Sequence, residues 1–383
     1  MPLDFYAAYT AGSTLPGLFT NFQSMSITRG RQWQTDPYSP SSATLVFRGV
    51  QTAPIGATVI VTDSEPTIVP QGSVIFIGTV KDTQIQYGIV SNLDYTTIVL
   101  EGILARWGRR QFTSRAITQA GTLAQISAVA TAIGYDGFTS VIGNGLSTAT
   151  AQTYVGNGLD LVNLLITTEM GHIAEIGSYT AIPSSPPSLT ISPNVTMYPR
   201  NYDTTVGLTF ADDSTANGIR YDGIEFTSAA QNYYTEATIN PQGLSAQTSG
   251  SGYYNITQDS LDYNTSQALS HAQYLVAQYN STSSVPYSIT ARYSNQNTST
   301  RQGQFNLALR PGNASSGQLI NLIFRGTTYP CIIEGIDIAA DVSDVVITLT
   351  LSSFDNNNYL ILNNATFGTL GTSSTYPGNK LGF

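Results

Sequence analysis

The chain has 383 residues, enough for two or three domains with separate hydrophobic cores. Only 10% of the residues are charged, against roughly 25% in an average soluble protein, and the net charge is −9. This balance excludes a global basic face for nucleic acid, and it is typical of an extracellular or virion surface rather than of a cytosolic enzyme.

Residues 1–110 are predicted to form a β domain. The segment 24–49 has the pattern of two strands joined by a polar loop. Short segments rich in β-branched residues follow at 57–63, 74–82 and 95–102. Several short strands separated by Pro, Gly, Asn and Asp predict an antiparallel β-barrel.

Residues 111–265 are predicted to form an α/β insert. Helical spacing predicts a helix over 124–133 that ends at Gly134, and a second helix over 159–175 with Asn157 as its N-cap and Gly177 as its stop. A proline-rich connector at 182–187 leads to mixed strands. The Ser/Gly-rich segment 243–252 is expected to be an exposed loop.

Residues 266–383 are predicted to begin with a helix over 266–279 and to continue as a second antiparallel β-barrel. The expected strands are 288–294, 305–312, 319–330, 331–341 and 344–354. The predicted fold class is therefore mixed α+β and β-dominated, with two antiparallel β-barrel domains and an intervening α/β insert.

One group of residues has the composition of a ligand set. Glu169, His172 and Glu175 share one face of the predicted second helix. A Glu-x-x-His pattern needs a second copy to hold metal, and the other histidine, His271, has no such context. We interpret the group as a solvated helix face and Cys331 as a small buried hydrophobe.

No Gly-x-Ser-x-Gly elbow and no His-Glu-x-x-His motif occurs in the sequence. We therefore predict no catalytic, cofactor-binding or metal-binding residue and no enzyme. Paired carboxylates for glycoside hydrolysis stay open, because such residues can be distant in sequence.

The arginines are the candidate interface residues. Arg106-Trp107-Gly108-Arg109-Arg110 is a basic aromatic segment, and Arg29-Gly30-Arg31 ends the first predicted strand of the segment 24–49. In an acidic chain these arginines favour pairing with carboxylates across a subunit boundary over nucleic-acid binding, with Trp107 as an anchor. The interface candidates are Arg29, Arg31, Arg106, Trp107, Arg109 and Arg110.

Four segments, in order, resemble the baseplate-hub type of minor tail protein of tailed phages. They are 24–49 with its Arg-Gly-Arg, the helical segment 157–177, the segment 268–294, and the ending 359–371 followed by "NKLGF" at 379–383. Together they span nearly the whole chain.

This resemblance implies a structural virion protein, a homotrimeric hub at the distal end of the tail. Its two tail-tube-like barrels per subunit would match a hexameric ring, and its lumen would form part of the channel for DNA ejection without sequence-specific binding. The implied partners are the distal tail protein ring, the tape measure protein, the tip and fibre proteins, and passing genomic DNA. No cofactor is implied.

Two alternatives stay open. A β-rich carbohydrate-binding adhesin, or receptor-binding protein, on a virion surface would present exposed aromatic platforms. A cell-wall hydrolase of the tail tip would cleave peptidoglycan. The N-terminus lacks the pattern of a signal peptide, and no apolar run approaches 18 residues, so no membrane span is expected.

Overall fold

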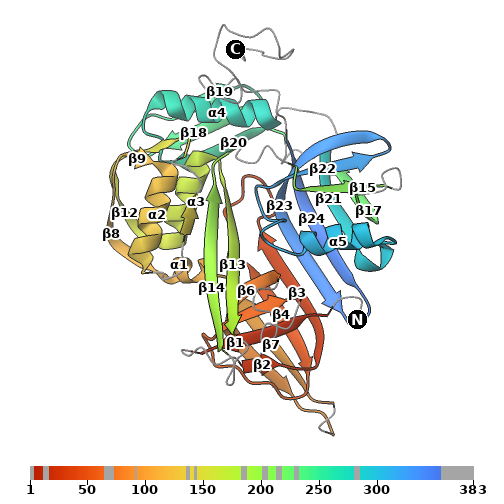
Figure 1. Ribbon diagram of the computed structural model, residues 1–383. Coiled ribbons are helices and arrows are strands. Elements are labelled where there is room, and N and C mark those ends of the chain that lie inside the picture. The colour runs from red at the N-terminus through yellow and green to blue at the C-terminus, as the bar shows by residue number, and fades with distance from the viewer. Residues whose placement is uncertain are drawn as a thin grey trace.

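The computed structural model describes residues 4–11, 17–63, 73–90, 93–134, 139–141, 145–182, 188–200, 206–212, 218–227, 233–279 and 285–354. The predicted dominance of β structure is confirmed. A 14-stranded sheet runs through both ends of the described chain (Figure 1). The resemblance of the ending 359–383 concerns residues outside the described part, as does most of the connector 182–187.

The N-terminal part of this sheet contains seven antiparallel strands in the order β3-β4-β7-β6-β5-β1-β2. They are β1 (Tyr6–Thr10), β2 (Gly17–Phe19), β3 (Phe22–Gly30), β4 (Ser42–Arg48), β5 (Thr58–Thr62), β6 (Val74–Gln86) and β7 (Tyr95–Glu101). The strands expected in this part of the chain are all present. Alternating burial along β3 and β4 shows why they form, since every second side chain enters the core.

The C-terminal part consists of β21 (Val285–Arg292), β22 (Leu319–Phe324), β23 (Thr327–Asp341) and β24 (Val345–Ser353), joined by β15 (Leu208–Ala211), β16 (Ile219–Arg220) and β17 (Gly223–Thr227). Strand β23 pairs with β3, placing Ile338 opposite Ile27. One hydrophobic core therefore extends under both parts of the sheet. Closure into two barrels is not among the strand pairings of the described residues, so the two-barrel arrangement stays a prediction.

The strand predicted at 305–312 is wrong. Residues Ser299–Ala308 form α5, preceded by the short 3-10 helix η3 (Tyr293–Asn295). The side chain of Thr298 accepts a hydrogen bond from the backbone N–H of Arg301, which caps the helix. Phe305 and Ala308 lie three residues apart and both enter the core, so the apolar spacing is helical.

A helical layer packs beside the sheet. It contains α1 (Leu104–Arg109), α2 (Thr122–Ile133) and α3 (Gly158–Glu169), with the strands β8 (Gln111–Ile117), β9 (Ala120–Gly121), β10 (Thr139–Val141), β11 (Thr148–Ala149) and β12 (Gln152–Asn157). Helix α2 ends at Gly134, as predicted, in the left-handed conformation with φ of 73°. The predicted N-cap of α3 is also confirmed, because the Asn157 side chain accepts from Asp160 N at 2.8 Å.

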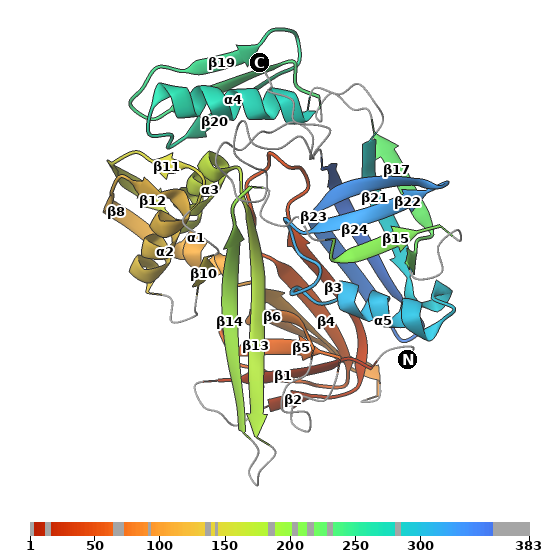
Figure 2. The ribbon, with the colours of Figure 1, turned by 45° about the horizontal axis from the view of Figure 1, so that its top comes forward.

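The second predicted helix is six residues too long. Met170 takes a left-handed conformation with φ of 55° and ends α3 after Glu169. The chain then forms β13 (His172–Ile182), which pairs with β14 (Ser188–Tyr198). Gly177 therefore lies inside a strand and stops no helix. This long hairpin crosses the N-terminal strands (Figure 2), where Tyr179 and Leu189 pack with Ile77.

A smaller layer covers one end of the molecule (Figure 2). Helix α4 (Thr265–Tyr279), at the predicted position, packs on a three-stranded sheet of β18 (Glu236–Pro241), β19 (Gln247–Gly250) and β20 (Asn255–Ser260), in the order β19-β18-β20. The loop expected at 243–252 thus includes strand β19, although its residues are exposed or half-buried.

Candidate functional site

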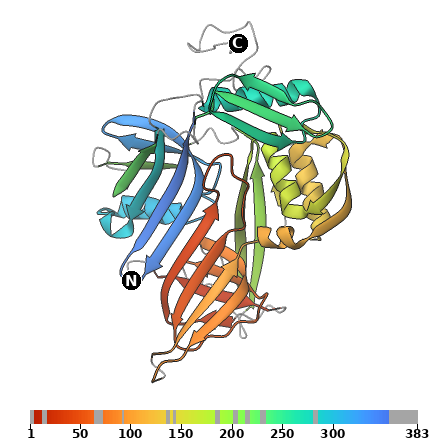
Figure 3. The same ribbon diagram turned by 180° about the vertical axis from the view of Figure 1, so that it is seen from behind.

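On one face of the large sheet, no other element of the described residues is packed (Figure 3). Side chains on this face alternate with core side chains along β24, β23, β3, β4 and β7, and strand register aligns them in rows across the five strands. We call it the open face. Its central residues are Ser24, Ser26, Thr28, Ser42, Thr44, Val46, Thr97, Val99, Asp337, Ala339, Asp341, Val346, Thr348 and Thr350.

The open face is polar but carries little charge. Its side chains are small, mostly hydroxyl-bearing or β-branched, and exposed or half-buried. Asp337 accepts a hydrogen bond of 2.7 Å from Thr28, and Asp341 is held by the backbone N–H groups of Ser343 and Asp344. Arg48 lies at one end of β4, outside these central rows. Arg292 of β21 lies opposite Val346 at the edge of the face, 4.0 Å from Asp222 and 3.9 Å from Asp344. The face therefore offers phosphate groups few cations.

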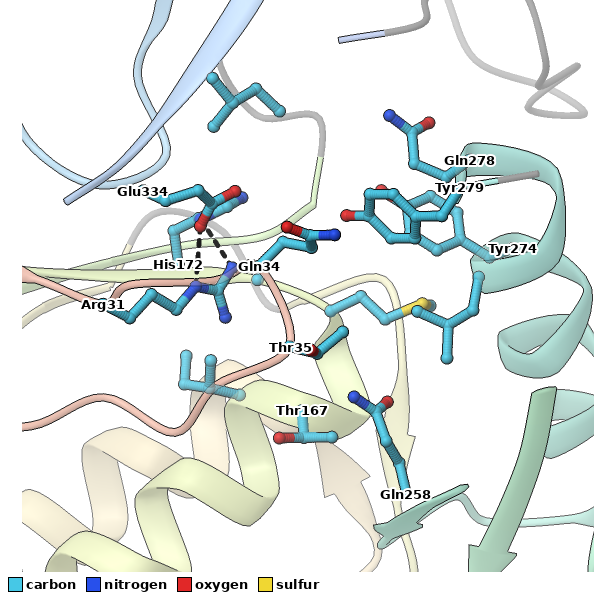
Figure 4. Close-up of a pocket in the computed structure, with 15 residues that line it drawn as sticks. Arg31, Gln34, Thr35, Thr167, His172, Gln258, Tyr274, Gln278, Tyr279 and Glu334 are labelled. Carbon is cyan, nitrogen blue, oxygen red and sulfur yellow. Dashed lines mark hydrogen bonds and ion pairs between the residues drawn. The ribbon is translucent and has the colours of Figure 1, made fainter. Parts of the chain in front are cut away.

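A buried polar cluster joins the sheet to the other two layers (Figure 4). Arg31, directly after β3, donates from Nε to Glu334 Oε2 of β23 at 2.7 Å. The Ser352 hydroxyl donates to the other oxygen of Glu334 at 2.6 Å. Burial alone would lower the pKa of Arg31, but Glu334 reverses this and raises it. Burial alone would raise the pKa of Glu334, but Arg31 holds it below its usual value. Both groups are therefore charged at neutral pH.

His172, the first residue of β13, completes this cluster. Its Nδ1 lies 3.5 Å from Nη2 of Arg31, a group that only donates, and 3.2 Å from the hydroxyl of Tyr38. Burial lowers the pKa of His172 to about 4, although Glu334 works in the opposite direction. Burial likewise raises the pKa of Tyr38 to about 12, and its hydroxyl lies 2.7 Å from Ser316 Oγ. His172 is thus neutral at pH 7.

The cavity beside this cluster is small. It has a volume of about 40 Å³, and Tyr274 and Tyr279 of α4 face Arg31 and Glu334 across it (Figure 4). Such a volume holds a water molecule or two, whereas small-molecule sites usually measure about 300–1,000 Å³. The cluster therefore works as a junction that fixes the sheet, β13 and α4 relative to one another.

Arg29 and Arg31 make their contacts inside one chain. Arg29 is 6% exposed and donates to the carbonyl oxygens of Ile75 and Leu309. Burial lowers the pKa of Arg29 to about 10, and the nearby Glu175 works in the opposite direction. The expected pairing of these two arginines across a subunit boundary does not agree with their burial.

The three residues of the predicted ligand set do not share a helix face, because α3 ends at Glu169 and leaves His172 and Glu175 on β13. Glu169 accepts from Thr122, Leu146 N and Ser147 N, whereas Glu175, on β13, accepts from Ser41 N and Leu104 N. Burial raises the pKa of both carboxyl groups. The interpretation as a solvated helix face is wrong, because Glu169 is buried, Glu175 is half-buried on a strand, and both hold loop backbone.

The described residues contain no group of three or more His, Cys, Asp or Glu side chains placed to bind a metal ion. His271 of α4 is buried and contacts Asp262, with 3.2 Å between Nδ1 and Oδ2. Cys331 is fully buried in β23, as expected, and burial raises its pKa to about 12.

Helix α1 carries the exposed arginines. Arg106, Arg109 and Arg110 line a surface hollow of about 260 Å³ together with Ile133 and Gly134. Arg109 donates to Glu101 at 2.5 Å. Trp107 is completely buried in the helical core, so it anchors α1 within the chain rather than a partner surface.

The sequence contained a signal for the open face but none for the junction. Ser24, Ser26 and Thr28 alternate with Met25 and Ile27, which is the pattern of a strand with one small polar face. Arg31 and Glu334 are 303 residues apart, and no local pattern links them.

The sequence matches no protein-family model and no curated protein. Solved structures do match. The tail protein from Neisseria meningitidis MC58 has a TM-score of 0.60 at 10% identity, covering 92% of this chain and 97% of that one. The 43 kDa tail protein of prophage MuSo2 from Shewanella oneidensis has a TM-score of 0.57 at 12% identity, covering 91% and 97%.

The fold is that of phage tail proteins. A third match, the E. coli c3393 protein, has a TM-score of 0.50 at 10% identity, covering 91% of this chain and 77% of that one. It is described as a component of the type VI secretion system with structural similarity to the T4 bacteriophage tail proteins gp27 and gp5. The resemblance to tail proteins noted in the sequence is therefore confirmed at the level of the fold.

Within the described part of this tail-protein fold, the helices are too short or too polar to cross a membrane.

Proposed function

We propose that the protein is a structural component of a phage tail, namely the trimeric hub at the distal end of the tail tube. Three copies would surround a channel, with two barrel-like halves per chain meeting a hexameric ring above. The partners would be the distal tail protein ring, the tape measure protein and the tip and fibre proteins. The protein would act by assembly and carry out no covalent chemistry.

The open face carries this proposal. It extends without interruption across β3 and β23, so one surface spans both halves of the chain. Its rows carry the half-buried Val46, Val99 and Val346 between hydroxyl groups, so the surface is neutral as well as polar. A channel for DNA needs a wall that does not bind phosphates, and serines, threonines and two aspartates satisfy that need.

The arginines of α1 are proposed as contacts to a neighbouring subunit or ring. Arg106 and Arg110 are exposed beside a hollow, in a chain with 24 acidic and 15 basic residues. A guanidinium recognises carboxylates through paired hydrogen bonds, so an acidic neighbour of the same composition is a suitable partner.

Electron cryo-microscopy of labelled variants tests the proposal. The only native cysteine, Cys331, is buried, so a maleimide-gold cluster reports on introduced cysteines alone. Ser26→Cys on the open face is expected to place three labels close to a threefold axis. Thr257→Cys, also exposed and on β20, is the matched control and is expected to place its labels away from the axis.

Two outcomes contradict the proposal. A monomeric particle in the presence of the distal tail protein would exclude the ring. Labels from Ser26→Cys at the periphery of a trimer would keep the assembly but exclude the open face as the channel wall.

A further inference from the structure

The outer face of the β18–β20 sheet is a polar surface without a packing partner among the described residues. Ala237, Ile239 and Ile256 point toward α4 and pack with its apolar side chains. The alternate side chains therefore point away from the helix. They are Glu236, Thr238, Asn240, Thr248, Asn255 and Thr257, with Asp259 at the end of β20; we call this the insert face.

The insert face already arranges its polar groups in pairs. The hydroxyl oxygens of Thr238 and Thr248 lie 3.0 Å apart, and Asn240 donates to Asp259 at 3.4 Å. Hydroxyl, amide and carboxylate groups on neighbouring strands present donors and acceptors at close, fixed intervals. A sugar ring presents hydroxyl donors and acceptors at its rim, at similar intervals.

Two exposed tyrosines stand at one end of this sheet. Tyr253 is fully exposed, although a tyrosine ring is usually at least half covered, and Tyr254 is 47% exposed. Tyr254 packs edge-to-face on Tyr233 with 5.2 Å between ring centroids. Asn255 begins β20 directly after Tyr254. Tyr253, two positions before Asn255, therefore has the strand parity of the insert face, whereas Tyr254 has the parity of Ile256 on the side of α4.

The loop that carries these rings is fixed by the backbone. Thr235 N and Glu236 N donate to the carbonyl of Tyr254 at 2.8 and 3.1 Å, and Ser251 N donates to Thr235 O at 3.0 Å. Gly250 has a φ of 77°, and a Cβ there would lie 2.1 Å from Thr235 O, so the turn requires glycine. The backbone that carries the two tyrosines is therefore ordered before a ligand binds.

The charge of this region selects among ligands. No lysine or arginine occurs between Arg220 and Arg292, whereas nine of the 23 tyrosines do. Glu236 and Asp259 give the insert face a negative charge. Phosphorylated or acidic polymers are repelled by such a surface, whereas an uncharged ligand with many hydroxyl groups is not.

We propose that the insert face and the adjoining, fully exposed Tyr253 form a binding surface for neutral saccharides. The ring of Tyr253 stacks on the C–H face of a sugar, because the negative face of an aromatic ring attracts the partly positive hydrogens. Glu236, Asn255 and Thr257 accept and donate hydrogen bonds at the sugar rim. The surface is shallow and open, so it binds within a polysaccharide chain rather than enclosing one end.

Saturation-transfer NMR and calorimetry with defined hexasaccharides test this surface. The probes are chitohexaose and cellohexaose as neutral ligands and hexagalacturonate as the anionic one. We expect binding of at least one neutral hexasaccharide by the intact chain, and none of hexagalacturonate. Tyr253→Ala is expected to weaken that binding at least about tenfold, as for other aromatic anchors of binding sites.

Tyr87→Ala is the matched control, because Tyr87 is 70% exposed on the distant β6–β7 hairpin and is expected to leave binding unchanged. Asn255→Ala, which keeps both rings, is expected to weaken binding less than Tyr253→Ala. Three outcomes would overturn the proposal. Neither neutral probe binds, hexagalacturonate binds more tightly than the neutral probes, or Tyr253→Ala and Tyr87→Ala lose the same affinity. None of these outcomes affects the trimeric hub, whose test concerns symmetry and the open face.

Discussion

Two groups of arginines look alike in the sequence and end in opposite environments. Arg31 is buried against Glu334, whereas Arg109, beside Glu101 at the surface, keeps 62% of its side chain exposed. Both pairs have hydrogen-bond geometry. The difference lies in what removal leaves behind. Glu334, 2% exposed, loses its only strong counter-charge in the interior, whereas removal of the exposed Arg109 side chain opens the 12% exposed Glu101 to water.

Removal of the Arg31 guanidinium is the largest effect we expect. Arg31→Ala leaves Glu334 buried beside Ser352 alone, and the free energy of unfolding should fall by about 3–5 kcal/mol. Urea titration followed by tryptophan fluorescence measures this loss. The double variant Arg31→Met/Glu334→Met removes both charges and should recover most of it. If the double variant is as unstable as Arg31→Ala, packing rather than charge explains the junction.

Acidification affects the same junction to an intermediate extent. The pKa of His172 is lowered to about 4 in the folded chain, whereas an unfolded chain titrates near 6.5. The unfolded state therefore binds the proton first, so His172 contributes stability that is complete above pH 6.5 and is lost as pH falls toward 4. The slope should approach about 1.4 kcal/mol per pH unit within this window.

The His172→Gln variant isolates that contribution. Carboxyl groups away from the cluster, such as Glu169 and Glu175, titrate alike in both proteins, so the difference between wild type and variant reports on residue 172 and on its interaction with Glu334. Thermal unfolding at pH 4.5 and 7 measures it. Identical pH dependence in the two proteins would show that His172 is solvated.

Substitution at the surface pair is expected to have the smallest effect. Arg109→Ala should change the free energy of unfolding by no more than about 1 kcal/mol, and 0.5 M salt should remove the change because the pair is screened. The same urea titration measures it. A loss as large as that of Arg31→Ala would mean that Glu101 depends on Arg109, and the contrast between the two pairs would fail.

Much of the strand content was predictable because it rests on local alternation. The strands β4 to β7, the helix α2 with its Gly134 stop and the cap at Asn157 all follow from residues within a few positions. The end of α3 could not be predicted in this way, because a left-handed Met170 has no sequence signature comparable to that of glycine.

The junction and the open face depend on long-range pairing. Hydroxyl alternation in β3 was visible in the sequence, but its continuation onto Asp337 and Ala339 depends on a register set about 300 residues later. For the same reason the sequence could not tell that Arg29 and Arg31 are interior residues, because the partners that bury them come from β6, α5 and β23.

The pairing of β3 with β23 also has a consequence for synthesis of the chain. Strand β3 ends at Gly30, and its neighbour begins at Thr327. At about 5–20 residues per second, the ribosome needs roughly 15 to 60 seconds to supply that neighbour, so one edge of the N-terminal sheet stays unpaired during that time. Its backbone groups are then available to other nascent chains. A rapid supply of complete chains, or a chaperone that covers β3, would therefore govern the yield of folded protein.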